Sequence, residues 1–118
     1  LTVTGVDDIQ ATIDTSAADR LLRTQCGPVL RLATEALSNS LRHAGTAHRR
    51  VTVQLYRGKF RLEVFDDGKG FSPTARKSSG MGLANMRARA RKLGAKLTIR
   101  ARPGKGTQVV LDIPLPAQ

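Results

Sequence analysis

Asp66-Asp67-Gly68-Lys69-Gly70 is the stretch that says most about the fold, because it ends a strand-like run at residues 60–65 and opens a polar, glycine-rich segment. A carboxylate at a strand end is a directional hydrogen-bond acceptor, and neighbouring glycines let a flat ligand approach the backbone. Asp66 is therefore suited to accept from the exocyclic amine of an adenine, with Gly68 and Gly70 leaving room for the ring. The same residues also form ordinary hairpin turns, so the interpretation depends on the segments around them.

Hydrophobic periodicity predicts alternating strands and helices along the whole chain. The expected elements are an extended segment at 3–13, a polar connection at 14–19, a helix at 25–44, strands at 50–56 and 60–66, a loop at 71–82, a helix at 83–93, and strands at 96–101 and 107–114. Because both adjacent strand pairs are joined by short turns, a mixed, largely antiparallel sheet is favoured over a parallel one. We therefore expect one α/β (α+β) domain over residues 1–118, a two-layer sandwich with the helices on one face of the sheet.

The helix expected at 25–44 has an apolar stripe and, by helical geometry, a polar stripe opposite it. The apolar stripe, assigned to the core, consists of Leu30, Ala33, Leu37, Leu41 and Ala44. The polar stripe spans an arc of about 100° and consists of Glu35, Asn39, Arg42 and His43. Such a stripe is most often a solvated surface, but asparagine is a poor helix former whose place within a helix calls for a reason.

A magnesium–triphosphate site would supply that reason. Asn39 offers a carbonyl oxygen to Mg²⁺, which takes few protein ligands and keeps several of its waters. Arg42 can neutralise phosphate oxygens, and His43 can hydrogen-bond to phosphate or sugar. Glu35 can orient or deprotonate an attacking group.

Two further segments fit a bound nucleotide. Gly80-Met81-Gly82-Leu83 directly precedes the second predicted helix, where free backbone amides form an anion site; a flexible hinge is the alternative. Thr107 begins the last strand, and its hydroxyl is expected near Asp66, helping to hold the adenine through a water. A simple turn cap is the alternative for Thr107.

The composition favours an anionic partner. Lys and Arg number 20 against 9 Asp and Glu among 118 residues, a formal net charge of +11. Aromatic residues for stacking bases are few, and they are Tyr56, Phe60, Phe65 and Phe71. A nucleic-acid partner is therefore not favoured, and the charge indicates only an anion.

Several classes of protein and site are excluded. Cys26 is the only cysteine, so an internal disulfide and a Cys/His metal site are ruled out and a cytoplasmic location is expected. No apolar run reaches membrane-spanning length and no signal-peptide pattern occurs. A P-loop and a Rossmann fingerprint are both absent. Because the chain starts at Leu1 rather than at a methionine, we expect it to be a piece of a longer protein.

Four segments together resemble the motifs of the GHKL ATP-binding fold shared by gyrase, Hsp90, MutL and histidine kinases. Residues 35–44 resemble the N box, 66–70 the G1 box, 80–83 the G2 box and 104–107 the closing GxGT segment, in the family's order. The run from Gly82 to Leu115 is similar to the C-terminal signature of bacterial sensor histidine kinases of the nitrate-sensor type. Ala88 departs from that subgroup, which commonly has Glu after Met-Arg.

The resemblance implies a protein-histidine kinase domain that binds ATP and Mg²⁺. By resemblance, Asn39 ligates Mg²⁺, Glu35 takes the acid role of the N box, Asp66 binds adenine, and Arg42 and His43 contact phosphate. The γ-phosphoryl group would pass to a histidine on separate dimerisation helices of a homodimeric kinase, and then to a response regulator. Two other functions remain open: a serine kinase of the anti-sigma-factor type with the same fold, and a basic nucleic-acid-binding module.

Overall fold

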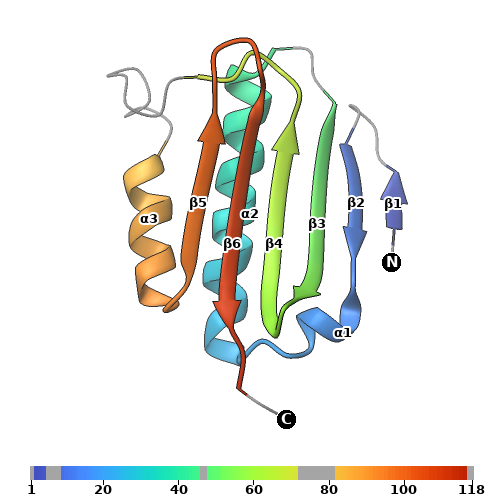
Figure 1. Ribbon diagram of the computed structural model, residues 1–118, viewed down its shortest axis with the longest axis vertical. Helices are drawn as coiled ribbons and strands as arrows, with labels where there is room; N and C mark the ends of the chain where they lie inside the picture. Colours follow the sequence, from blue (N-terminus) through green and yellow to red (C-terminus); the bar gives the residue numbers. More distant parts are fainter. Residues whose placement is uncertain (1, 5–8, 46–47, 72–81, 117–118) are drawn as a thin grey trace.

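A six-stranded sheet with two helices packed on one face forms the domain, as a computed structural model describes it for residues 2–4, 9–45, 48–71 and 82–116. The strands lie in the order β1-β2-β3-β4-β6-β5. Their bounds are Thr2–Thr4 (β1), Ile9–Ile13 (β2), Arg49–Tyr56 (β3), Lys59–Asp66 (β4), Lys96–Ala101 (β5) and Thr107–Pro114 (β6). The helices are Thr15–Ala18 (α1), Arg23–His43 (α2) and Leu83–Lys92 (α3). Figure 1 shows α2 behind the central strands with α3 beside it, which confirms the predicted two-layer sandwich.

The sheet is mixed, as expected, with one parallel pair. β2 and β3 run parallel, and every other neighbouring pair is antiparallel. A parallel pair requires a crossover, and the segment containing α1 and α2 supplies it. β3 and β4 form a hairpin whose two turn residues, Arg57 and Gly58, have φ values of 50° and 77°. Positive φ at both positions is the geometry of the two-residue turns that match strand twist.

The beginning of the chain differs from expectation. The extended segment predicted at 3–13 contains two strands, β1 and β2, that pair antiparallel with each other. The connection predicted at 14–19 contains the short helix α1, which Asp14 caps by accepting a hydrogen bond from the Ser16 amide at 3.0 Å. Ala17 in this helix is fully buried, so the polar composition of the segment concealed one anchoring residue.

The face of α2 that packs on the sheet is only partly the predicted one: Ala33 and Leu37 pack against the core and Ala44 is buried, as expected. Leu30 and Leu41, assigned to the core, are 67% and 53% exposed. The residues of α2 that are buried are Val29, Leu32, Ala36 and Ser40. Both stripes have helical spacing, and the small side chains at 36 and 40 let the helix approach the strand ends closely. Packing therefore turned the buried face away from Leu30 and Leu41, which hydrophobicity alone did not indicate.

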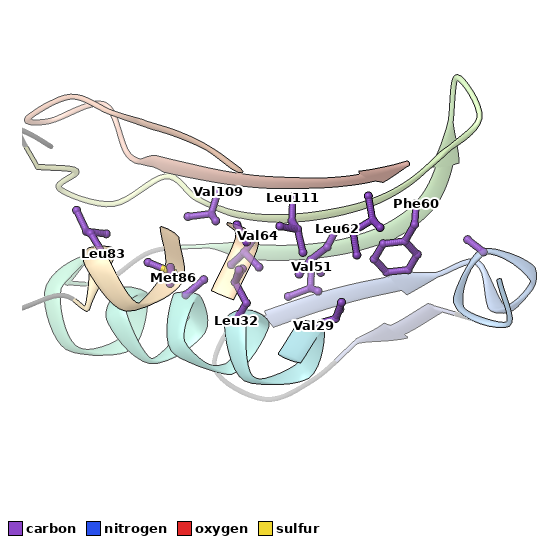
Figure 2. Close-up of a cluster of buried hydrophobic side chains, with 14 residues drawn as sticks. Val29, Leu32, Val51, Phe60, Leu62, Val64, Leu83, Met86, Val109 and Leu111 are labelled. Atoms are coloured by element: carbon purple, nitrogen blue, oxygen red, sulfur yellow. The ribbon is translucent and has the colours of Figure 1, made fainter. Parts of the chain in front are cut away.

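The core lies between the sheet's inner face and the two helices (Figure 2). β4 and β6 contribute alternate residues, in keeping with the period of two along a strand. The largest fully buried side chains are Phe60, Leu32, Met86, Leu111 and Ile113. On α3 the buried residues are Leu83, Met86 and Ala90, which share one stripe of the helix. Among the described residues, no helix is both long and apolar enough to cross a membrane.

Candidate nucleotide-binding site

A pocket lies where the C-terminal turns of α2 meet one end of the central strands. Its space is about 370 Å³, a volume that includes the solvent at its open mouth. The lining residues are Ala36, Asn39, Ser40, His43, Ala44, Asp66, Gly70, Phe71, Leu83, Met86, Thr107 and Val109. Residues from both helices and from β4 and β6 therefore form one site, although they are far apart in the sequence.

Asp66 is the charged group of this pocket. It ends β4, is only 4% exposed, and is the Cα partner of Thr107 at the start of β6. Its Oδ1 accepts a hydrogen bond from the Gly68 amide at 3.0 Å. An ionised carboxylate has about four acceptor positions, so this bond orients the side chain while capacity remains for a ligand. Apolar side chains line the same pocket, among them Met86 from α3 and Val109 from β6.

Gly68 and Gly70 are required by the packing of their own segment. Gly70 has φ +63°, and a Cβ there would overlap the carbonyl oxygen of Arg102. A Cβ on Gly68 would overlap the carbonyl oxygen of Ala44 at the end of α2. Gly70 also lines the pocket. Gly68 does not, and it is connected to the pocket only by the hydrogen bond that its amide donates to Asp66. The glycines thus let the 66–70 segment lie against α2 and the β5–β6 connection, a reason beyond the ligand access predicted from sequence.

The predicted polar stripe of α2 divides between two places. Asn39 and His43 line the pocket. Arg42 and Glu35 line a separate groove between α2 and α3. Arg42 remains connected to the pocket because its Nη2 donates to Asn39 Oδ1 at 3.0 Å.

The start of α3 approaches α2 at Glu35. Gly82 is the N-cap of α3 with φ +67°, and a Cβ there would overlap Glu35 Oε1. Leu83 follows as a buried wall of the pocket. Gly80 and Met81 lie outside the described residues, as do the predicted loop residues 72–79. The structure therefore brings the motif at 35–44 and the end of the motif at 80–83 together, where Gly82 contacts Glu35.

Arg49 is a buried residue of the site that sequence reasoning missed. Its side chain is on the inner face at the start of β3, opposite Asp66 in the β3–β4 register, and the residue is 7% exposed. Its Nε donates to Ser40 Oγ at 2.7 Å, and its Nη2 donates to the carbonyl oxygens of Ser40 and Gly45 at 3.1 and 3.2 Å. These bonds hold the last turn of α2, which carries His43. The available signal was alternation, since Arg49 shares its strand face with Val51 and Val53.

The donor set suits a magnesium–nucleotide complex better than a metal held by protein alone. Among the described residues, no three His, Cys, Asp or Glu side chains are grouped so as to hold a metal ion. Mg²⁺ typically needs only one or two protein oxygens beside substrate phosphates and water. Asn39 Oδ1, at the pocket, is an oxygen of that kind. A buried carboxylate between apolar walls likewise fits a purine.

Comparison with known proteins establishes the family. The family described as "Histidine kinase-, DNA gyrase B-, and HSP90-like ATPase" matches residues 27–117. That match covers most of the chain and includes every side chain that lines the pocket. The chain belongs to this ATPase family.

Relatives within the family are sensor kinases. Over 87 residues, or 74% of this chain, it is 37% identical to the signal transduction histidine-protein kinase/phosphatase DegS of Brevibacillus brevis and covers 22% of that protein. It is 36% identical over 87 residues, again 74% of this chain, to the sensor histidine kinase LiaS of Bacillus subtilis, covering 24% of it. The chain thus spans about a quarter of the length of these curated relatives.

Solved structures agree with this assignment. The histidine kinase domain from the blue-light activated histidine kinase EL346 of Erythrobacter litoralis superposes with a TM-score of 0.67 at 30% identity, over 77% of this chain and 48% of that one. The fold of this chain therefore also occurs in a histidine kinase domain of known structure.

Proposed function

We propose that this chain is the ATP-binding catalytic domain of a two-component sensor histidine kinase. The observation that carries the proposal is the buried carboxylate of Asp66, which shares one pocket with Asn39, His43 and Thr107. A purine fits between Met86 and Val109, with Asp66 accepting from its exocyclic amine and Thr107 beside it. The sensor-kinase relatives favour this function over a serine kinase or a nucleic-acid module.

The triphosphate is expected to extend along α2 from the adenine toward α3. Asn39 would hold Mg²⁺, which supplies neutralisation of phosphate charge when bound. His43 and Arg42 would contact phosphate oxygens. Glu35 would orient or deprotonate the attacking group, at the point where Gly82 meets it. The anion site proposed for Gly80, Met81, Gly82 and Leu83 would complete the enclosure.

The parent protein is proposed to be a homodimeric kinase in which this domain acts on a separate helical segment. The γ-phosphoryl group would pass to a histidine there and then to a response regulator. We place the domain in the cytoplasm and its parent in the nitrate-sensor-type subgroup, which the run from Gly82 to Leu115 supports. The domain alone is expected to bind ATP without phosphorylating itself, because His43 and His48 lack the setting of a phosphoacceptor helix.

Calorimetric titration tests the nucleotide site. The domain is titrated with a non-hydrolysable ATP analogue with and without Mg²⁺, and with the matching GTP analogue. Saturable, adenine-selective binding is expected, because a carboxylate accepts from the amine of adenine and repels the carbonyl oxygen that guanine presents at that position. Equal binding of both analogues would contradict the role of Asp66, and no binding at millimolar nucleotide would contradict the proposal.

The Asn39→Ala variant tests the metal site. We expect Mg²⁺ to strengthen binding of the ATP analogue in the unaltered domain but no longer in this variant, because the amide oxygen is the proposed protein ligand. Asn85→Ala is the matched control, since Asn85 is exposed on α3 and outside the pocket. If Asn39→Ala keeps the full magnesium effect, the metal is held elsewhere.

A further inference from the structure

The strand β5 forms one border of the sheet. It is the last strand in the sheet order, and within the described part of the chain it pairs only with β6. Every second residue of a border strand directs its N–H and C=O away from the neighbouring strand. The helices α2 and α3 both lie beneath the sheet and not in its plane (Figures 1 and 2). β5 therefore presents a backbone edge on which another strand can pair.

The side of β5 that faces away from the helices is basic. Lys96, Thr98 and Arg100 alternate along it, and the two basic residues are exposed. Among the described residues, neither basic side chain forms an ion pair. Asp112, opposite Lys96 in the β5–β6 register, is already bound by Arg61 through two hydrogen bonds of 2.7 and 3.0 Å. Both cations of β5 can therefore meet carboxylates of a partner.

The residues between them face the helical layer. Leu97 and Ile99 are partly buried and pack against the core. Because side chains alternate between the two faces of a strand, a neighbour paired with β5 would place every second side chain beside these apolar residues. Its other side chains would lie beside Lys96 and Arg100. A matching strand therefore alternates apolar residues with acidic ones.

The same basic surface continues past the end of β5. A hollow there is lined by three basic residues, Arg100, Arg102 and Lys105, and no acidic residue is among those that line it. Arg102 and Lys105 are exposed in the turn that joins β5 to β6. A partner strand that extends beyond Ala101 would meet these cations as well, so the charge complementarity extends over the whole end of the edge.

A second copy of β5 does not match this edge. Antiparallel self-pairing centred on Thr98 would set Lys96 of each copy directly opposite Arg100 of the other, and like charges directly opposite destabilise a sheet. Basic residues on a border strand are a known protection against such self-pairing. Because the same two residues attract carboxylates, the edge selects an acidic strand.

We propose that β5 is a docking edge for an extended, acidic protein segment, which pairs with it as an additional strand and places carboxylates beside Lys96 and Arg100. Main-chain hydrogen bonds supply affinity in this mode of recognition, and alternate side chains supply specificity. A protein segment is favoured over a nucleic acid because a sugar–phosphate backbone lacks the regular N–H and C=O groups that pair with a strand edge. The inference does not rest on the proposed function.

The test uses the ¹⁵N-labelled domain and synthetic peptides. The first peptide carries Glu at i and i+4, Thr at i+2, and Val at i+1 and i+3, and in the second peptide Gln replaces each Glu. The Glu peptide is expected to bind saturably by fluorescence anisotropy and to slow the exchange of β5 amide hydrogens in NMR spectra. The Gln peptide is expected to bind about two- to thirtyfold more weakly, the range for two cross-strand charge pairs.

Backbone methylation distinguishes strand pairing from attraction between charges. Two versions of the Glu peptide carry N-methyl groups, one on the Glu and Thr residues and the other on the Val residues, so that each version blocks the N–H groups of one edge of the peptide strand. We expect one version to lose binding and the other to keep it, because only one edge of the peptide faces β5. Equal affinity of the two versions would contradict strand pairing.

Charge reversal in the domain locates the site. The variant Lys96→Glu/Arg100→Glu is expected to prefer a peptide in which Lys replaces each Glu. General attraction would preserve the preference for the Glu peptide, because the domain keeps a large positive net charge. Arg23→Glu/Lys59→Glu is the matched control, since it makes the same change in charge at exposed positions of α2 and β4. The control should still prefer the Glu peptide, and circular dichroism checks that both variants are folded.

Four results would overturn the proposal. Two are absence of binding by the Glu peptide at millimolar concentration and a folded Lys96→Glu/Arg100→Glu variant that still prefers this peptide. The third is displacement of the peptide by a DNA oligonucleotide that slows the same β5 amides, which would assign the edge to phosphate polymers. The fourth is protection of these amides that rises with the concentration of the domain alone, which would assign the edge to a second copy.

Discussion

At the scale of single residues, Asp66 combines two interactions that belong to different functions. Its Oδ1 accepts from the Gly68 amide and so shapes the turn that follows β4. Asp66 also lines the pocket, where a negative charge favours a ligand that donates hydrogen bonds. Because an amide oxygen can also accept from Gly68, the structural interaction can be kept while the charge is removed.

Asp66→Asn is therefore expected to remain folded and to lose affinity for the ATP analogue by about 10- to 150-fold, the worth of one hydrogen bond to a charged group. Calorimetry measures the affinity and circular dichroism checks the fold. Asp67→Asn is the matched control, because Asp67 is exposed and its carboxylate accepts from the His48 amide at 2.7 Å, outside the pocket. Unchanged affinity in folded Asp66→Asn would refute the adenine assignment.

Four of the residues for which the sequence predicted a directional chemical role lie together in the structure. Asp66, Asn39, His43 and Thr107 stand in recognisable patterns, and the structure places them around one pocket. Arg49 was missed because, in a basic chain, alternation with Val51 and Val53 is a weak sign that an arginine is buried. Its burial depends on the strand face and on the nearby end of α2, both of which are set by tertiary packing.

At the scale of elements, the turn after β4 and the last turn of α2 hold the pocket in shape. The turn depends on Gly70, which has a left-handed backbone conformation and packs against the backbone of Arg102. The helix end depends on a buried side chain that binds its final carbonyl groups, at Arg49. Each can be tested with a neighbour that shares the residue type but lacks the contacts.

Gly70→Ala is expected to lower the free energy of unfolding by more than about 2 kcal/mol, because it adds a steric overlap with the Arg102 carbonyl to the cost of positive φ. Gly104→Ala is the matched comparison. Gly104 has φ +77° with open space where a Cβ would lie, so only the conformational cost of about 1–2 kcal/mol applies. Urea denaturation measures the free energy of unfolding of the two variants. Equal losses would show that the overlap is relieved by movement of the loop.

Arg49→Ala is expected to lower the free energy of unfolding by about 2–4 kcal/mol, since it leaves buried groups of α2 without their donor. Arg50→Ala, in the next position, should change it by less than about 1 kcal/mol, because Arg50 is exposed and its ion pair with Glu63 spans 3.9 Å. Urea denaturation again compares the two. Similar values for both variants would mean that the bonds at the helix end contribute little.

At the scale of the whole molecule, the class of fold was predictable and the choice of packed face was not. Strand alternation, two short hairpin connections and two periodic helices were enough to predict a mixed sheet covered on one side. The edge of the buried face of α2 was misassigned because Leu30 and Leu41 are as regularly spaced as Val29, Leu32 and Ala36. The parallel pairing of β2 with β3 could not be predicted from local patterns either, because α1 and α2 lie between these strands in the sequence.

The pairing of Asp66 with Thr107 has a consequence for the state of the pocket before a ligand binds. These residues lie on β4 and β6, each of which has a neighbouring strand on both sides. Amide hydrogens of such central strands exchange with solvent mainly through global unfolding. We expect hydrogen–deuterium exchange, measured by mass spectrometry, to be among the slowest in β4 and β6, which form the floor of the pocket, even without nucleotide. The ligand would then slow exchange chiefly in the segments around that floor, so the docking surface for the base is in place before the base arrives.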